Sequence, residues 1–294
     1  MSLSGEDAPR AVIVLSSHVA RGSVGNRAAV FALETLGFPV WAVPTVVLPW
    51  HPGHGAATRI VPEPQEFAAL LGDLEGAKWL GEVGAVLSGY LGDETQGAAV
   101  ASLVRAVKKR NPRALYVCDP IMGDEGGLYV GQAVAESIRD RLMPLADLAT
   151  PNRFELEWLS GAELPDMGAV TAAALDAGPP AMLVTSAPVP NPGGIGNFLL
   201  TPAEAMLVEH RRIERPPNGL GDLTAAVFLA RLMGGATHAK ALQSATAAVF
   251  EILARTAKRG ADELTLETDS QSLSQPMAMV QMRRLPHPAG DRRA

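Results

Sequence analysis

The sequence predicts an α/β fold, in which a mostly parallel central sheet has helices packed on both of its faces. The first observation is an alternation, up to Thr185, of short apolar runs with longer stretches of helical periodicity. Parallel strands need a crossover connection, most often a helix, so this alternation favours a parallel sheet covered on both sides. The second observation is composition, because 47% hydrophobic residues among 294 suffice for a large core.

The expected strands are short and apolar, as the buried strands of a parallel sheet are. They lie at residues 11–15, 40–43, 85–87, 115–118, 148–150 and 182–185. The helices between them carry apolar residues at helical spacing, and most of them end at a glycine or before a proline. They span residues 26–36, 95–110, 131–142 and 153–159.

The pattern changes after Thr185. Two apolar runs, 196–200 and 205–208, flank a short polar turn and predict an antiparallel hairpin. Thr237 is a plausible cap for a long helix. Two helices and a final edge strand are expected at residues 222–232, 237–258 and 277–282.

No internal repeat and no linker divides the chain. We therefore expect one three-layer α/β/α domain over residues 11–285. Residues 1–10 are expected to form a flexible N-terminus and residues 286–294 a flexible C-terminal tail.

Composition and charge narrow the possible functions. A formal net charge of −6, with only short basic runs, argues against a nucleic-acid surface. The single cysteine, Cys118, excludes an internal disulfide and fits a reducing compartment, so a cytoplasmic location is expected. The sequence shows neither a signal peptide nor an apolar run long enough to span a membrane.

A glycine-rich turn at residues 218–222 leads directly into the apolar run that follows Leu223. Gly219 and Gly221 leave the backbone bare, so the amides at the start of the helix can bind an anion such as a phosphate. A carboxylate beside an anion site is unfavourable unless it accepts a proton from a group about to be phosphorylated, which suggests Asp222 as a general base. The alternative is that Asp222 caps the helix.

Ligands of parallel sheets bind beyond the carboxyl ends of the strands, and two acidic residues are expected there. Asp119 follows the fourth strand, and Glu155 begins the helix after the fifth. Together they could hold Mg²⁺ on bound phosphates, since this ion prefers oxygen ligands. Alternatively, Asp119 turns the chain before Pro120 and Glu155 is an ordinary first-turn helix charge.

Other motifs exclude neighbouring classes. The chain lacks the Gly-x-x-x-x-Gly-Lys-Ser/Thr loop of P-loop kinases and the Gly-x-Ser-x-Gly elbow of α/β hydrolases. His51 and His54 lie close together but have no evident further zinc ligands. Their loop, 49–55, is rich in proline and glycine and is interpreted as a flap over a bound ring, with an ordinary surface loop as the alternative.

Taken together, six segments in order resemble the pyridoxal kinases of the ribokinase-like superfamily. The match covers nearly the whole chain, from Val12 to Leu285. Its segments are 17–26, 28–31, 87–92, 116–123, 150–156 and 219–222.

The resemblance implies a three-layer α/β/α fold, usually a homodimer, that uses ATP and Mg²⁺ to phosphorylate the 5′-hydroxymethyl group of pyridoxal, a form of vitamin B6. It leaves a requirement for a monovalent cation such as K⁺ open. Asp222 matches the general base, and the amides of Gly219, Leu220 and Gly221 match the anion hole.

The remaining site residues are also implied by the resemblance. On the nucleotide side, Asp119 and Glu155 match the residues for Mg-ATP. Other ATP-binding positions implied there are Thr150, Asn152, Thr185, Ser186, Gly219 and Gly221. On the acceptor side, Ser17 matches the contact to the pyridine ring. Further acceptor contacts are expected from Thr45, His51, Tyr90 and Asp222.

Departures from the family pattern lie on the acceptor side. Pro52 replaces a threonine of the flap, Arg21 stands where a tyrosine is frequent, and Leu220 replaces a threonine or valine. Two alternatives therefore stay open: a kinase for a hydroxymethylpyrimidine of the same superfamily, and a vitamer-binding protein without catalysis. The intact Asp222, Asp119 and Glu155 argue against the second, because a binding protein needs no base beside an anion hole.

Overall fold

The computed structural model describes residues 10–287, and the flexibility expected for 1–9 and 288–294 lies outside this range. Its main sheet has nine strands within that range. In the order in which they lie side by side, they are β2 (Val40–Leu48), β1 (Ala11–Val19), β3 (Val83–Ser88), β4 (Leu115–Cys118), β7 (Leu148–Ala149), β8 (Ala181–Ala187), β9 (Gly194–Leu200), β10 (Ala205–Arg211) and β11 (Gln281–Leu285).

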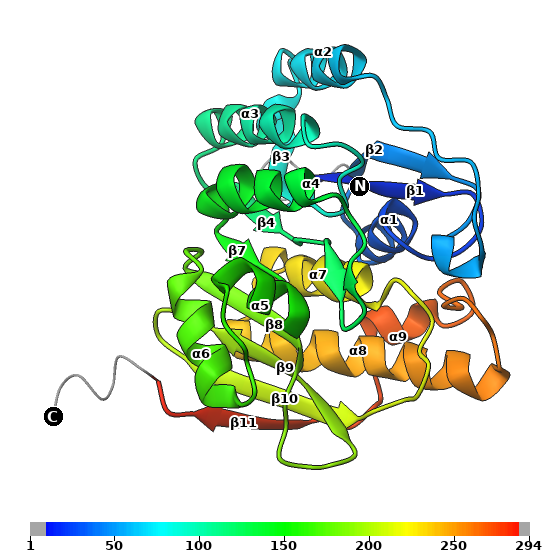
Figure 1. Ribbon diagram of the computed structural model, residues 1–294, viewed down its shortest axis with the longest axis vertical. Helices are drawn as coiled ribbons and strands as arrows, with labels where there is room; N and C mark the ends of the chain where they lie inside the picture. The colour runs from blue at the N-terminus through cyan, green and yellow to red at the C-terminus, as the bar shows by residue number, and fades with distance from the viewer. Residues whose placement is uncertain (1–9, 288–294) are drawn as a thin grey trace, which may run out of the picture.

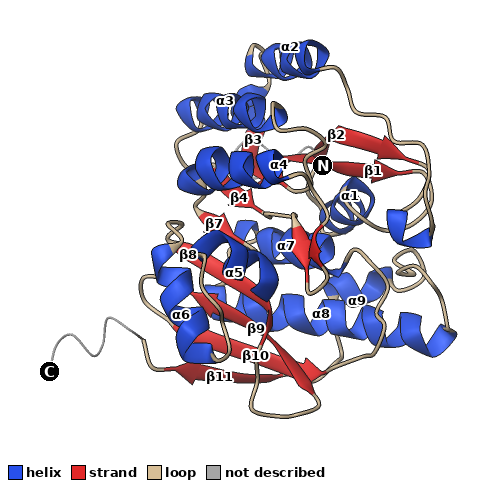
Figure 2. Cartoon of the chain, viewed as in Figure 1, coloured by secondary structure: helices blue, strands red, loops and turns tan. Residues whose placement is uncertain are grey.

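The predicted fold class is confirmed. The strands from β2 to β8 are parallel to their neighbours, whereas β9, β10 and β11 add an antiparallel edge. Figure 2 shows β2 at one end of the sheet and β11 at the other. A separate two-stranded hairpin, β5 (Gly123–Asp124) with β6 (Gly127–Leu128), follows β4.

Helices cover both faces of the sheet (Figure 1). One face packs against α1 (Asn26–Thr35), α7 (Leu220–Met233) and α8 (His238–Arg259). The other packs against α2 (Pro64–Glu75), α3 (Gln96–Arg110), α4 (Gln132–Ser137), α5 (Arg153–Ser160) and α6 (Met167–Asp176). A short helix, α9 (Ser270–Ser274), contacts α8 and α1.

Successive side chains of each strand point to opposite faces of the sheet, so they pack alternately against the two helix layers. In β1, Val12 and Val14 join the core beneath α1, α7 and α8, while Ile13 and Leu15 join the core beneath α3. All four are fully buried. This double burial explains why the predicted strands read as continuous apolar runs.

Some elements differ from the sequence prediction. The helices α2 and α6 were not predicted, because each buries only a few apolar residues, such as Phe67 and Leu71 of α2. The edge strand β11 begins at Gln281, not at residue 277, and Met277 and Met279 are exposed. Ion pairs of Arg283 and Arg284 with β10 and the turn before it accompany its backbone pairing.

Within residues 10–287, no helix combines the length and apolarity that crossing a bilayer would require.

Candidate active site

The carboxyl ends of the parallel strands and the first turn of α7 enclose a cavity of about 530 Å³. This is the position in which ligands bind to open parallel sheets. Its lining residues are Ser17, Val24, Leu48, His51, Pro52, Gly53, Arg59, Tyr90, Asp119, Ile121, Asp124, Tyr129, Thr150, Asn152, Glu155, Thr185, Asn218, Gly219, Gly221 and Asp222.

The glycine-rich turn forms the N-terminus of α7. Gly219 is the N-cap, with φ +92°, and Leu220, Gly221 and Asp222 are the first three helical residues. The amides of Gly219, Leu220 and Gly221 have no acceptor within the helix and are available to an anion, whereas the Asp222 amide donates to its own carboxylate. A Cβ atom at Gly219 would lie 2.0 Å from the carbonyl oxygen of Ser23, so both the backbone conformation and the close approach require glycine.

The capping interpretation of Asp222 is wrong. The helix starts at Leu220, two residues before the predicted start, and Gly219 occupies the cap position. The Leu220 side chain packs against the core beneath α7, outside the cavity lining, so only its backbone faces the anion site. A leucine is therefore compatible with this turn.

The Asp222 side chain is half-buried, and its carboxylate accepts hydrogen bonds from the backbone N–H groups of Gly25 and of Asp222 itself. Burial raises its pKa to about 6. Ordinary aspartate has a pKa near 4, so Asp222 is a stronger base than usual, yet it is largely ionised at neutral pH. A carboxylate with this pKa can accept a proton from a hydroxyl group during transfer.

Asp119 lies directly after β4 and is 4% exposed. The Thr150 hydroxyl donates a hydrogen bond of 2.8 Å to its Oδ1 atom. Burial, followed by the nearby charges of Glu155 and Asp222, raises the pKa of Asp119 well above its ordinary range. Asp119 therefore faces the cavity, in addition to ending the strand before Pro120.

Glu155 is the third residue of α5 and completes a capping box with Asn152. Its two oxygens accept hydrogen bonds from the amides of Asn152, at 2.8 Å, and Met122, at 3.0 Å. Burial nevertheless raises its pKa to about 8. Glu155 thus has both roles that the sequence left open, because it belongs to the first turn of a helix and also lines the cavity.

The acidic side of the cavity fits a hard cation in part. Asp119 and Glu155 are buried, and within residues 10–287 neither has an ion pair with Lys or Arg. The charge of Glu155 raises the pKa of Asp119, and the charge of Asp222 raises the pKa of both. A divalent cation would relieve this repulsion. No group of three or more metal-ligating side chains occurs in the described part of the chain, so phosphate and water oxygens would have to complete the shell.

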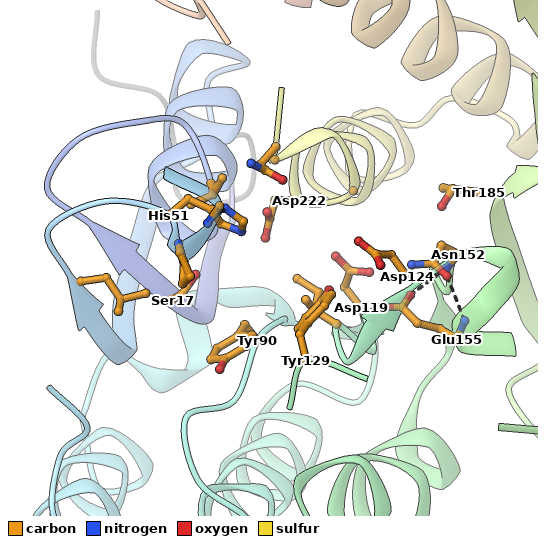
Figure 3. A pocket seen from close by; sticks show the side chains of 18 of the residues that line it. Ser17, His51, Tyr90, Asp119, Asp124, Tyr129, Asn152, Glu155, Thr185 and Asp222 are labelled. Carbon is orange, nitrogen blue, oxygen red and sulfur yellow. Dashed lines mark hydrogen bonds between the residues drawn. The ribbon is translucent and has the colours of Figure 1, made fainter. Parts of the chain in front are cut away.

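Figure 3 shows Asp222 between two groups of side chains. On one side lie Ser17, His51 and Tyr90; on the other lie the acidic residues together with Asn152 and Thr185. The first group matches the expected acceptor contacts, and the second matches the expected nucleotide contacts. The Asp222 carboxylate therefore lies where the two substrates of a transfer reaction would meet.

Two expected contacts lie outside the cavity lining. Thr45 is inside β2, fully buried, and its hydroxyl donates a hydrogen bond of 2.6 Å to the Tyr90 carbonyl oxygen. It can act on the pocket only through Tyr90. Ser186 lies in an irregular stretch of β8, is exposed and has φ +55°. The expectation that their side chains line the pocket does not hold.

His51 enters the cavity from the loop at 49–55, whose residues 52–54 form a single 3₁₀ turn. Its Nδ1 atom accepts a hydrogen bond of 3.1 Å from the Gly53 amide, which leaves the proton on Nε2. Burial lowers the pKa of His51, so the ring is mainly neutral at pH 7. It can donate one hydrogen bond to a bound ring.

Sequence reasoning missed several of the lining residues. The β5–β6 hairpin brings Asp124 and Tyr129 to the cavity, and the pair Gly126 and Gly127 was the signal that could have revealed it. Tyr129 is half-exposed, but desolvation of its hydroxyl, followed by the charges of Glu155 and Asp222, raises its pKa and keeps the hydroxyl protonated. Leu48 and Arg59 were also missed.

Among the residues that the structure describes, one Lys or Arg side chain lines this cavity, and it is Arg59. Its guanidinium donates a hydrogen bond of 2.5 Å to the Gly92 carbonyl oxygen, two residues after Tyr90. No sequence pattern marked it, because it follows the flap as an isolated charge among mostly apolar residues.

Amides at a helix N-terminus, a carboxylate in the first turn of that helix and two acidic residues across the cavity are the arrangement expected of a small-molecule phosphotransferase on an α/β/α fold. Comparisons with known proteins agree. The family model described as phosphomethylpyrimidine kinase matches residues 81–267. A pyridoxal kinase PdxY of Rubrobacter xylanophilus is 40% identical over 281 residues, which cover 93% of this chain and 97% of that protein.

Two further proteins extend the comparison. The pyridoxal kinase PdxY of Leifsonia xyli is 37% identical, over 90% of this chain and 96% of its own length. The solved structure of pyridoxal kinase from Leishmania donovani with ADP and pyridoxamine has a TM-score of 0.87 and 28% identity, over 94% of this chain and 100% of that one. The chain belongs to the pyridoxal kinase family.

Proposed function

We propose that this protein transfers the γ-phosphoryl group of ATP to the 5′-hydroxymethyl group of pyridoxal, and that pyridoxine and pyridoxamine are further acceptors. The observation that carries this is the position of Asp222. It lies in the first turn of α7, beside three free amides, with a pKa raised to about 6, between the acceptor and nucleotide sides of the cavity.

In this proposal, Asp222 accepts the proton of the acceptor hydroxyl as its oxygen attacks phosphorus. The amides of Gly219, Leu220 and Gly221 donate hydrogen bonds to the oxygens of the transferring group. Such proton transfer is worth about 10² to 10⁴ in rate, and the loss of one oxyanion donor costs a similar factor. Burial of Asp119 and Glu155 supports a nucleotide side that is shielded from water.

The proposal assigns Mg-ATP to the acidic side, with Asp119 and Glu155 holding the ion and Thr150, Asn152 and Thr185 near the nucleotide. Mg²⁺ would neutralise phosphate charge there. A monovalent cation such as K⁺ remains a further possible requirement implied by the family resemblance. On the acceptor side, Ser17, His51 and Tyr90 would contact the pyridine ring.

A hydroxymethylpyrimidine kinase is the second candidate. Two observations favour it: the matching family model describes phosphomethylpyrimidine kinases, and Pro52 lines the cavity where a threonine is frequent in pyridoxal kinases. Against it stand the relatives that match nearly the whole chain, which are pyridoxal kinases. We also propose that the protein is a cytoplasmic homodimer. The single cysteine, which fits a reducing compartment, supports the location, and the family resemblance supports the dimer.

The test is to supply Mg-ATP with pyridoxal, or with hydroxymethylpyrimidine, and to measure the phosphorylated product. Pyridoxal phosphate is expected with wild type, with a loss of at least roughly a hundredfold in Asp222→Asn. Asp166→Asn is the matched control, because Asp166 caps α6 away from the cavity and asparagine caps equally well. Its activity should equal that of wild type.

Each other outcome identifies an alternative. Product from the pyrimidine alone would place the chain with the pyrimidine kinases. Tight binding of pyridoxal without product would support a binding protein. Equal activity in Asp222→Asn and Asp166→Asn would remove Asp222 as the base. A molecular mass of one chain, measured by light scattering, would refute the homodimer.

A further inference from the structure

Three loops that are far apart in the sequence meet at the carboxylate of Glu263. Glu263 belongs to the loop after α8, and its side chain is only 13% exposed. One neighbour is the loop at 22–25, whose Ser23 amide donates a hydrogen bond of 3.3 Å to its Oε2 atom. The other is the flap at 49–55, whose His54 Nε2 atom lies 2.8 Å from its Oε1 atom.

The loop at 22–25 connects Glu263 to the base. A Cβ atom at Gly22 would lie 2.5 Å from Oε1 of Glu263, and one at Gly219 would lie 2.0 Å from the Ser23 carbonyl oxygen. The Gly25 amide donates its hydrogen bond to Asp222. Glu263 therefore holds the segment that packs on the anion turn and orients the base.

The flap connects Glu263 to the acceptor side. His54 ends the 3₁₀ turn, and the two residues before it, Pro52 and Gly53, line the cavity. The Trp50 indole closes this loop from its other end, with a hydrogen bond of 3.1 Å to the Gly55 carbonyl oxygen. His54 thus joins this short loop to Glu263, and its Nδ1 atom also lies 4.0 Å from Oδ2 of Asp262.

The neighbouring carboxylate provides a contrast. Asp262 pairs with Arg21 at 2.7 Å, but its side chain is 60% exposed and that of Arg21 is 55% exposed. Exposed pairs of this kind contribute little, whereas a shielded carboxylate with several donors is held firmly. Two adjacent acidic residues therefore differ in their expected importance.

We propose that Glu263 is a positioning residue, which fastens the flap to the loop that orients Asp222. Closing the flap over the acceptor and fixing the base are then one event, so the acceptor is enclosed only when the base is in place. This inference rests on the proposed function, because it concerns acceptor binding by the same cavity.

The experiment compares His54→Ala, His54→Gln and Glu263→Gln with wild type, using steady-state kinetics for pyridoxal and for ATP. His54→Ala should raise the KM for pyridoxal about tenfold and leave the KM for ATP within about twofold. His54→Gln keeps a donor for Glu263 and should recover most of the affinity. Glu263→Gln should raise the same KM and also lower kcat about tenfold, since it loosens both loops.

Coupling gives a second readout. If His54 acts through Glu263, the double variant should raise the KM for pyridoxal no further than Glu263→Gln alone, whereas independent residues would multiply their effects. Asp262→Asn is the matched control, and its constants should stay within about twofold of wild type. Thermal unfolding of each variant shows whether a change is confined to the site.

Three results would overturn the inference: an unchanged KM for pyridoxal in His54→Ala, multiplied effects in the double variant, or equal damage in Asp262→Asn and Glu263→Gln. His54 is near the surface, so His54→Ala is expected to fold even if a variant of Glu263 does not. Failure of the proposed function would instead appear as absence of turnover by wild type, which separates the two.

Discussion

Burial holds the pKa of Asp222 at about 6, and this sets the pH range in which the residue can act as a base. Below that pH the carboxyl is protonated and cannot accept another proton. We expect kcat/KM for pyridoxal to be constant above the pKa and to fall about tenfold per pH unit below it. A rate profile from about pH 5 to about pH 8 at saturating Mg-ATP measures this. A rate that stays constant down to the lowest pH would exclude Asp222 as the base.

At Asp119, function and stability oppose each other. Its raised pKa means that the folded chain favours the protonated carboxyl. Asp119 therefore stabilises the fold fully below the ordinary aspartate pKa, and this stabilisation is lost as the pH rises through the raised pKa of the folded state. Asp119→Asn removes the charge, and its amide oxygen can still accept the hydrogen bond from Thr150. We expect this variant to lack activity but to melt roughly 2–4 °C higher than wild type at about pH 7 without Mg²⁺.

The pH dependence of that difference is the control. At about pH 4, where wild type carries the proton, the two melting temperatures should converge. A variant that melts lower than wild type at neutral pH would show that the Asp119 charge is not a source of instability.

At the scale of elements, the start of α7 depends on how closely it approaches the loop at 22–25. Gly219→Ala would place a methyl group 2.0 Å from the Ser23 carbonyl oxygen, at a φ of +92°. Both the helix N-terminus and the loop would have to move, so we expect kcat to fall at least tenfold, with about 1–3 kcal/mol lost from the free energy of unfolding.

Gly37→Ala is the matched control for this change. Gly37 has nearly the same φ, +90°, but a Cβ atom there would meet nothing within 4 Å. It should lose about 1 kcal/mol of stability and keep its kcat. Similar kinetic damage in both variants would show that strain in the backbone, not contact with Ser23, is what disturbs the site.

The sequence predicted elements well where local chemistry and burial agree. The strand β4, the helix α5 with its αL glycine at Gly161, and the Thr237 cap lie where they were expected. The start of α7 was placed two residues late, because an aspartate looks like a cap unless the φ of the preceding glycine is known. The β5–β6 hairpin was missed because its strands have two residues each.

The sequence correctly predicted those site residues that lie just after the ends of strands or at the start of the next helix. Asp119, Glu155 and Asp222 meet in one cavity, as parallel topology requires. Thr45 could not be assigned correctly, because β2 extends to Leu48 and carries it into the interior. Contacts across long separations, such as Glu263 with His54, leave no local pattern in a sequence.

At the scale of the whole molecule, the cavity unites segments from Ser17 to Asp222, so a ligand that binds it should stabilise the entire chain. Mg-ATP at about a hundred times its dissociation constant should add about 2.7 kcal/mol, or roughly 5–10 °C in melting temperature. Calorimetry with ATP, with and without Mg²⁺ and with K⁺ or Na⁺, measures this. In Asp119→Asn the part of the ATP-induced stabilisation that depends on Mg²⁺ should disappear. Equal shifts of melting temperature on adding Mg²⁺ in wild type and in Asp119→Asn would exclude Asp119 as a ligand of the ion.

The order of the strands also affects the chain while it is being synthesised. After β1 and β2, each new strand of the main sheet is added on one side, from β3 through β4, β7, β8, β9 and β10 to β11, so it can pair with a strand that the ribosome has already released. The helices α7 and α8 emerge late, however, and they cover the face that contains Val12 and Val14. A nascent chain that stops before Leu220 leaves the part of this apolar face that α1 does not cover open to chaperones, or to other unfinished chains.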